Sequence, residues 1–325
     1  MNNRRKRRSK IRRVFVPLFL IIVIIVVSFC INPSAVTAYE KRHYNRSMKQ
    51  HELFASSLCV ADENVSLESF QTEDKLGAGG LFEVKQQKVC YAKDIHKRVY
   101  PASLTKILTF YLALEYGNLS DVVTISKNAT SVPADSSSAN LRVGDQLTLL
   151  DLLYALMLPS GNDSAVAIAE HISGSVEDFV LLMNEEARKM GATHTNFTNP
   201  HGYHDEEHYT TAYDLYLMFQ KCIEKKEFVK VISAKDYQVK ITKADGNTRT
   251  VTWKQSNQYV NGLQETPENV TILGGKTGTT NAAKACLILY CKDQHLNPYI
   301  SIIMGSETRT DLYANMTALI STIAD

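Results

Sequence analysis

The sequence predicts an α+β fold, in which both ends of the domain build one antiparallel sheet and a helical subdomain lies between them. Short runs with the period of strands occur over 81–92 and again over 273–304. Between them lie apolar runs of helical length. Because the strands stand at both ends and do not alternate with helices, we expect the sheet to be antiparallel.

The first third of the body predicts strands followed by one apolar helix. Pro101–Lys106 leads into an apolar run from Ile107 to Leu114, which predicts a helix that ends near Gly117, since glycine is common just past helix ends. A short strand at 122–125 and a loop at 131–140 should follow. Earlier strands are expected at 58–61, 81–84 and 89–92, the last two as a hairpin.

The rest of the chain changes from helices to strands. Residues 147–158 are almost wholly apolar but too short to cross a membrane, so they predict a buried helix. Further helices are expected at 163–171, 176–190 and 212–223. Asp245-Gly246 predicts a hairpin turn between two strands. The expected strands are 237–241, 248–253, 273–279, 285–290 and 299–304, and a closing helix is expected at 311–323.

The N-terminus predicts export across a membrane. Residues 1–13 hold eight basic residues and no acid, while the remaining 28 basic and 34 acidic residues give a net charge of −6. The body therefore has no electrostatic footprint for nucleic acid. The basic stretch precedes the apolar run 14–31, which predicts a cytoplasmic tail followed by a transmembrane anchor, with a stalk at 32–57. The alternative is a signal sequence cleaved near Ala38, which would give a secreted domain at 58–325.

The cysteines indicate neither a disulfide framework nor a zinc site. One of the six, Cys30, lies in the apolar run, which leaves an odd number outside it. No C-x-x-C pair is present among the others, so we expect most of them to be small buried side chains.

A first candidate site is the pair Ser103 and Lys106. Residues three apart share one face of a helix, so hydroxyl and amine should be neighbours. A serine hydroxyl becomes a good nucleophile when a base takes its proton, and a lysine that is kept neutral can be that base. Alone, the pattern favours a capping serine and a surface lysine over a catalytic pair, so it needs further partners.

Two more short motifs supply such partners. Ser160-Gly161-Asn162 stands in a tight break between two apolar helices, where its side chains have little freedom. Gly274-Gly275-Lys276-Thr277-Gly278-Thr279 falls on an expected strand, and glycines there indicate the close approach of another backbone or a ligand. The lysine and hydroxyls beside them could bind an anionic end of a substrate.

With these three motifs in this order, the chain resembles the penicillin-recognising serine enzymes. It is most similar to the low-molecular-weight D-alanyl-D-alanine carboxypeptidases, serine peptidase family S11. The resemblance runs from about Leu58 to the C-terminus and implies a β-lactamase/transpeptidase-like fold. The further strings that carry it are Tyr100–Lys106, Ser160–Asp163, Phe179-Val180 with Met183-Asn184, and Asn199-Pro200-His201-Gly202. After that glycine the family usually has leucine, whereas this chain has Tyr203.

The resemblance implies catalytic roles for three residues. Ser103 would attack the carbonyl between the two D-alanines of a peptidoglycan stem peptide, Lys106 would take its proton, and Ser160 would pass a proton to the leaving amine. Asn162 would hold substrate and Lys106, and the charge of Lys276 would help to keep Lys106 neutral.

The remaining implied roles concern the bound substrate. The backbone N–H groups of Ser103 and Thr279 would form an oxyanion hole, and the hydroxyls of Thr277 and Thr279 would hold the terminal carboxylate beside Gly278. Arg309 is a loosely spaced match to a family arginine that supports this carboxylate, and a surface role is an equal alternative. β-Lactams would be covalent inhibitors, and neither a metal nor another cofactor is implied.

Three other functions compete with this one. A class A β-lactamase also needs a glutamate for deacylation, usually in E-x-x-L-N, and no such string lies between Asn162 and Lys276. A metalloenzyme could use His201, His204 and His208 with 205–207, but their spacing matches no zinc motif, and a polar surface loop is the simpler interpretation. A penicillin-binding sensor that stays acylated remains open.

Overall fold

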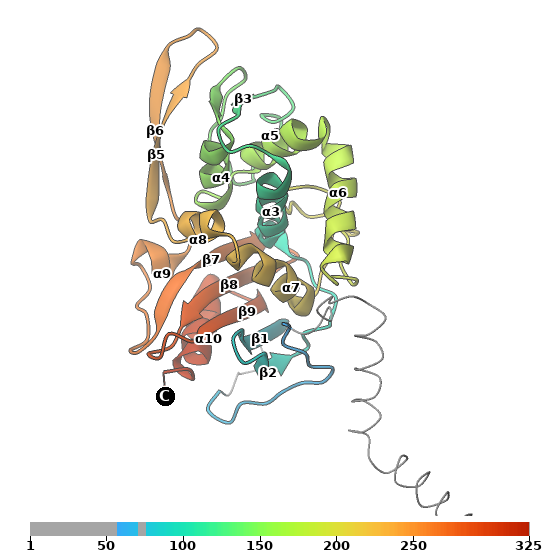
Figure 1. The fold of residues 1–325 in the computed structure, drawn as a ribbon, viewed down its shortest axis with the longest axis vertical. Helices are drawn as coiled ribbons and strands as arrows, with labels where there is room; N and C mark the ends of the chain where they lie inside the picture. The colour runs from blue at the N-terminus through green and yellow to red at the C-terminus, as the bar shows by residue number, and fades with distance from the viewer. Residues whose placement is uncertain (1–56, 71–75, 325) are drawn as a thin grey trace, which may run out of the picture. The chain divides into compact units, whose positions relative to one another are not determined.

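The computed structural model describes residues 57–70 and 76–324, and Figure 1 shows their arrangement. The segments predicted at 1–13 and 14–31, and all but the last residue of 32–57, lie outside the described residues. Within these described ranges, no helix combines the length and the apolar character that crossing a membrane requires.

The main sheet is antiparallel and joins both ends of the described chain. Its five strands follow the order β2-β1-β9-β8-β7, so that Ala78 pairs with Met304. The strands are β1 (Ala78–Glu83), β2 (Lys88–Lys93), β7 (Thr271–Thr280), β8 (Lys284–Lys292) and β9 (Pro298–Ser306). This topology confirms the predicted α+β fold, and the predicted hairpin at 81–92 is β1–β2.

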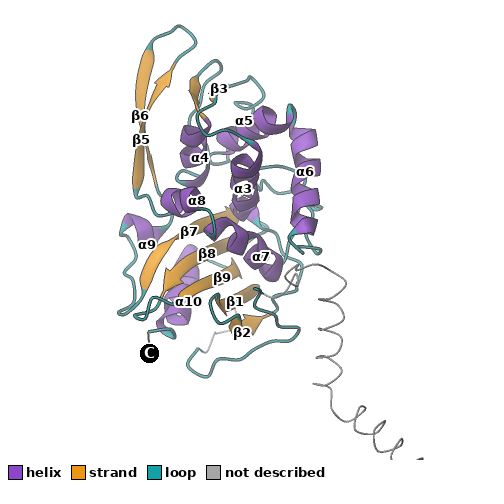
Figure 2. Cartoon of the chain, in the orientation of Figure 1, coloured by secondary structure: helices purple, strands orange, loops and turns teal. Residues whose placement is uncertain are grey.

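Both faces of the sheet are covered, which explains why β8 is apolar between its terminal lysines. Leu287 and Leu289 face the core beneath α10 (Arg309–Ser321), whereas Ile288 faces the helical subdomain. A strand that is buried on both faces loses the usual alternation of apolar and polar residues. In Figure 2 the helices and the sheet form distinct layers, with most of the helices gathered on the side of the sheet opposite α10.

The helical subdomain is built around α3 (Lys106–Tyr116), which is apolar around its whole circumference and therefore buried. It packs against α4, α5, α6 and α7. The other helices are the 3₁₀ turn η1 (Ala102–Thr105), α4 (Leu149–Met157), α5 (Asn162–Ser173), α6 (Val176–Lys189), α7 (Ala212–Ile223), α8 (Lys226–Ile232) and α9 (Gln258–Asn261).

A second antiparallel sheet flanks the helices, with strand order β3-β4-β5-β6. Its long hairpin turns at Gly246, as predicted, and extends beyond the helices in Figure 1. The strands are β3 (Val122–Thr124), β4 (Gln146–Thr148), β5 (Asp236–Thr242) and β6 (Thr248–Lys254).

Two local predictions are wrong for identifiable reasons. Residues 58–61 form no strand, because tyrosine side chains satisfy this backbone: Cys59 N donates to Tyr216 Oη at 2.8 Å, and Tyr213 Oη donates to Cys59 O at 2.8 Å. The helix predicted from residue 147 begins two residues later, because Thr148 and Asp151 form a capping box there. The short helix α8 was not predicted.

Candidate active site

Ser103 lies in the 3₁₀ turn η1, directly before α3. Lys106 is the first residue of α3. In a 3₁₀ turn, side chains three residues apart eclipse one another, and Lys106 Nζ lies 3.1 Å from Ser103 Oγ. Neither residue has the capping or surface role of the simpler interpretation: Pro101 and Thr105 stand at the cap positions, and Lys106 is fully buried.

The amine of Lys106 is held by two fixed acceptors besides the serine. Its Nζ donates to Asn162 Oδ1 at 2.7 Å and to His201 O at 2.7 Å. Burial first, and then the positive charge of Lys276, hold the pKa of Lys106 well below its usual range. A neutral amine has two N–H groups, which these two acceptors occupy, so its lone pair is left facing the hydroxyl of Ser103.

Ser160 is placed by a tight backbone turn and by the second buried lysine. Its φ is +63°, and Gly161 N donates to Ala155 O at 3.0 Å across the break between α4 and α5. Lys276 Nζ donates to Ser160 Oγ at 2.9 Å and to Thr277 O at 2.8 Å. Lys276 is fully buried, and this burial lowers its pKa to about 7.

Strand β7 runs directly beside the serine turn because Gly278 has no side chain. A Cβ there would lie 3.0 Å from Pro101 O and 3.2 Å from Ser103 N. The hydroxyl of Thr277, one residue earlier, lies 2.9 Å from Ser256 Oγ. This close approach brings the backbones of β7 and η1 together, as the glycines of the motif predicted.

A cleft of about 440 Å³ opens at Ser103. Asn162 and Thr279 line it together with two loops. Arg309 does not line this cleft; it is exposed and borders a neighbouring one with Thr279 and Lys284. The other lining residues are Asp135, Ser136, Ser137, Gly202, Tyr203, His204, Thr280, Asn281 and Ala282.

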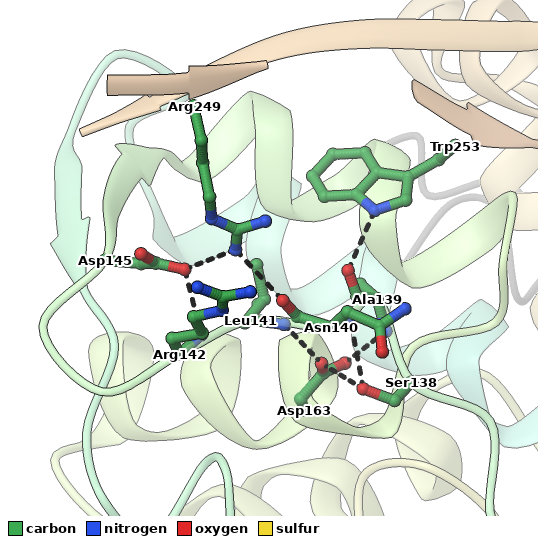
Figure 3. Close-up of polar contacts among 9 residues, drawn as sticks. All are labelled: Ser138, Ala139, Asn140, Leu141, Arg142, Asp145, Asp163, Arg249 and Trp253. Atoms are coloured by element: carbon green, nitrogen blue, oxygen red, sulfur yellow. Dashed lines mark hydrogen bonds and ion pairs between the residues drawn. The ribbon is translucent and has the colours of Figure 1, made fainter. Parts of the chain in front are cut away.

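The loop that carries Ser136 and Ser137 is held by Asp163, a supporting residue that sequence reasoning had noted only within a family string. The buried carboxylate of Asp163 accepts hydrogen bonds from Ser138 Oγ at 2.6 Å and from the backbone N–H groups of Ala139 (2.9 Å), Leu141 (3.0 Å) and Ser164 (2.9 Å). Figure 3 shows the contacts with Ser138, Ala139 and Leu141. Asp163 directly follows Asn162, so one short segment places both the amide that contacts Lys106 and the cleft loop.

The hairpin β5–β6 holds the same loop from its other side. Trp253 Nε1 donates to Ala139 O at 3.0 Å, and an Arg249 Nη donates to Asn140 O at 2.9 Å (Figure 3). Arg249 also pairs with buried Asp145 at 2.6 Å. The flanking sheet therefore braces a wall of the cleft.

Replacing Asp163 with asparagine should lower the free energy of unfolding by about 3 kcal/mol, because an amide offers one acceptor where several donors converge. The cleft loop should loosen as well, so the acylation by penicillin that the family resemblance implies should slow. Urea denaturation and acylation kinetics measure the two effects, with exposed Asp62→Asn as the control. An unchanged midpoint for Asp163→Asn would contradict the bracing role.

His208 links the serine turn to the loop at 191–209 and was not predicted to do so. Thr198 N donates to His208 Nδ1 at 3.0 Å, so Nε2 carries the proton and donates to Thr105 Oγ1 at 2.8 Å. Thr105 Oγ1 in turn donates to Ala102 O at 2.8 Å. This chain of hydrogen bonds fixes η1 from outside the three motifs.

The histidines of this loop do not converge on one point. His201 Nδ1 accepts from Tyr203 N at 3.1 Å, and the ring of His204 packs edge-on against Tyr100. In the described part of the chain, no group of three or more His, Cys, Asp or Glu side chains could hold a metal ion.

Stability should fall as the pH drops from about 6.5 toward 4. Burial lowers the pKa of His201 to about 3 and that of His208 to about 4. The unfolded chain, with ordinary histidine pKa values near 6.5, then binds protons that the native state does not, and acid favours unfolding. Urea denaturation at pH 7.5, 6 and 5 should show this loss. In His208→Gln the slope of the unfolding free energy against pH should fall by the equivalent of about one proton. The control His295→Gln, at an exposed position, should keep the wild-type slope. Equal slopes for the two variants would contradict the prediction.

Known proteins resemble this chain in sequence. The family model described as D-alanyl-D-alanine carboxypeptidase, Peptidase_S11, matches residues 75–308. D-alanyl-D-alanine carboxypeptidase DacF of Bacillus subtilis is 33% identical over 246 residues, covering 74% of this chain and 60% of the relative. D-alanyl-D-alanine carboxypeptidase DacC of Escherichia coli is 30% identical over 266 residues, which cover 79% of this chain and 62% of the relative. The chain thus spans roughly three fifths of the length of these curated relatives.

Two solved structures are similar to this chain over most of the described residues. The Streptomyces K15 DD-transpeptidase has a TM-score of 0.71 at 29% identity, with 77% of this chain and 97% of that chain covered. Penicillin binding protein 5 from Haemophilus influenzae has a TM-score of 0.68 at 30% identity, with 78% and 71% covered. These matches confirm the β-lactamase/transpeptidase-like fold predicted from the sequence.

Proposed function

Because the chain belongs to the D-alanyl-D-alanine carboxypeptidase family of serine peptidases, we propose that it removes the terminal D-alanine from peptidoglycan stem peptides through an acyl-enzyme on Ser103. The observation that carries this proposal is the buried amine of Lys106, 3.1 Å from Ser103 Oγ and fixed by two other acceptors. A neutral lysine in this position is the base that a serine nucleophile needs.

Acylation begins when Ser103 Oγ attacks the carbonyl carbon of the bond between the two D-alanines. Lys106 takes the hydroxyl proton as the new C–O bond forms. The backbone N–H groups of Ser103 and Thr279 stabilise the oxyanion. The closeness of β7 to η1 at Gly278 supports this pairing of donors.

The C–N bond then breaks, and Ser160 relays a proton: it gives its own proton to the leaving amine of D-alanine and receives in its place the proton that Lys106 took from Ser103, so that Lys106 is neutral again. Lys276, 2.9 Å from Ser160 Oγ, supports this transfer and attracts the D-alanine carboxylate. The hydroxyls of Thr277 and Thr279 bind the same carboxylate, and Arg309 adds longer-range attraction from the neighbouring cleft. Water then attacks the ester on Ser103, with Lys106 again as base, and releases the shortened peptide.

A β-lactam would be attacked by Ser103 in the same way, and its ring would open to form an ester with Ser103 that hydrolyses slowly. None of the residues that line the described cleft is a glutamate, which disfavours β-lactamase chemistry of the class A kind. The sensor alternative differs from the proposal only in deacylation.

The test is release of free D-alanine from a peptide ending in D-Ala-D-Ala by the purified full chain. One equivalent of D-alanine per peptide, with repeated turnover, is the expected result. Stable penicillin labelling without any turnover would favour the sensor. Rapid hydrolysis of penicillin would favour a β-lactamase.

We also propose that residues 14–31 anchor the chain in the cell membrane, with the catalytic domain at 58–325 on the outer side. The apolar run and the basic residues before it support this orientation. Full-length protein should remain in carbonate-washed membranes, and its N-terminus should be intact. A mature N-terminus just after Ala38, with soluble protein, would show instead that the segment is a cleaved signal.

A further inference from the structure

Tyr203 and Asp135 meet at the edge of the cleft and come from two different loops. Tyr203 Oη donates to the carboxylate of Asp135, at 3.2 Å from Oδ1 and 3.4 Å from Oδ2. Both residues line the cleft that opens at Ser103. Tyr203 is also the position at which this chain departs from the family string. The pair therefore shapes the cleft in a way that the three motifs do not determine.

Of the groups proposed to hold the leaving D-alanine, only Thr279 lines this cleft, which favours the acyl side of Ser103 as its place. The groups that would receive the leaving amine and its carboxylate, Ser160, Lys276 and Thr277, do not line it. Asn162 and Thr279 do, together with the two loops that carry Asp135 and Tyr203. A peptide acylated on Ser103 would thus place the residue before its D-alanine near Asp135 and Tyr203.

The charge of this part of the cleft is set by Asp135. It is the only carboxylate among the lining residues, and no lysine or arginine lines the same cleft. The ion pairs of the described residues do not include Asp135. A carboxylate can accept about four hydrogen bonds, so the single phenol leaves room for a donor from a ligand. The negative charge of Asp135 also raises the pKa of Tyr203.

We propose that Asp135, positioned by Tyr203, binds a cationic amine on the side chain of the residue that precedes D-Ala-D-Ala. Peptides with a free side-chain amine at that place are then better substrates than peptides in which it is acylated. This inference rests on the proposed carboxypeptidase function and adds the class of acyl donor. Tyr203 acts as a positioning residue, because its hydroxyl orients the carboxylate.

The test compares two substrates, Nα-acetyl-L-Lys-D-Ala-D-Ala and Nα,Nε-diacetyl-L-Lys-D-Ala-D-Ala, by D-alanine release from the full chain. At low salt, kcat/KM should favour the free amine by about two- to fivefold, as for an exposed ion pair at the strong end of the range. The preference should shrink at 0.5 M NaCl because exposed charges are screened.

Variants distinguish the contribution of Asp135 and Tyr203 to this preference from general effects on the fold. Asp135→Asn should bring the ratio of the two kcat/KM values to about one, and Tyr203→Phe should lower the ratio only in part. Asp62→Asn, an exposed acid outside the cleft, should keep the wild-type ratio.

Equal kcat/KM for both substrates in the wild type, or a full preference in Asp135→Asn, would overturn the inference while leaving the carboxypeptidase function intact. A wild-type ratio in Tyr203→Phe would overturn the positioning role. Absence of D-alanine release from either substrate would overturn the proposed function, and this inference with it.

Discussion

Lys106→Arg should acylate with penicillin about 10²- to 10⁴-fold more slowly than the wild type, the range by which a general base accelerates such steps. Arginine keeps its charge at all accessible pH values, so it has no lone pair for the proton of Ser103. The guanidinium would also have to fit a site that is fully buried. Stopped-flow acylation by a fluorescent penicillin measures the rate.

The matched control is Lys240→Arg at an exposed position of β5, which should acylate at the wild-type rate. Lys106→Met separates the loss of the base from the addition of a charge, and it should be slowed to a similar extent. A circular dichroism spectrum and a Tm close to the wild type would show that each variant is folded. Acylation of folded Lys106→Met at the wild-type rate would rule out Lys106 as the base.

Gly202→Ala should destabilise the protein by at least about 3 kcal/mol and prevent normal acylation. Gly202 has a φ of +86°, and an added Cβ would lie 1.8 Å from Ala102 O and 2.8 Å from Thr105 Oγ1. The methyl group therefore meets the backbone that holds Ser103, and either the loop or the serine turn must move. Urea denaturation gives the loss of stability, and penicillin labelling gives the loss of activity.

Gly246→Ala is a close control for the backbone conformation. Its φ is +81°, and no atom lies within 4 Å of the added Cβ. It should cost only the strain of the left-handed conformation, about 1 kcal/mol, without any effect on acylation. Equal losses at both glycines would show that the contact with Ala102 contributes nothing.

Much of the fold was predictable because its strands carry clear local signals. The hairpins at 81–92 and 237–253 have alternating patterns, the second one also has the turn residues Asp245-Gly246, and β8 and β9 are mostly apolar. The strand prediction at 58–61 was wrong because an apolar pattern does not show which groups will bond to the backbone. Here tyrosine side chains, and not a neighbouring strand, hydrogen-bond to it. The start of α4 depended on a capping box that the apolar run obscured.

The candidate site likewise has residues that could be predicted from short motifs and groups that could not. Short motifs identified Ser103, Lys106, Ser160, Asn162 and Lys276, and the structure brings these five side chains together. The sequence could not indicate that a backbone carbonyl, that of His201, would hold the amine of Lys106, because any residue type provides such a group.

Supporting side chains were missed for a related reason. His208 contacts Thr105 across 103 residues, and Trp253 contacts Ala139 across 114. No local spacing encodes such pairs. Burial, which the sequence pattern did not reveal for Lys106, is also the larger cause of its lowered pKa, ahead of the charge of Lys276.

The most direct test of the central claim is to locate the acyl group that a D-Ala-D-Ala substrate leaves on the protein. Acid quenching during turnover, followed by digestion and mass spectrometry, should place the acyl group on Ser103. Ser103→Ala should show no adduct and release no D-alanine. An adduct on another residue such as Ser160, or continued D-alanine release by Ser103→Ala, would contradict the account.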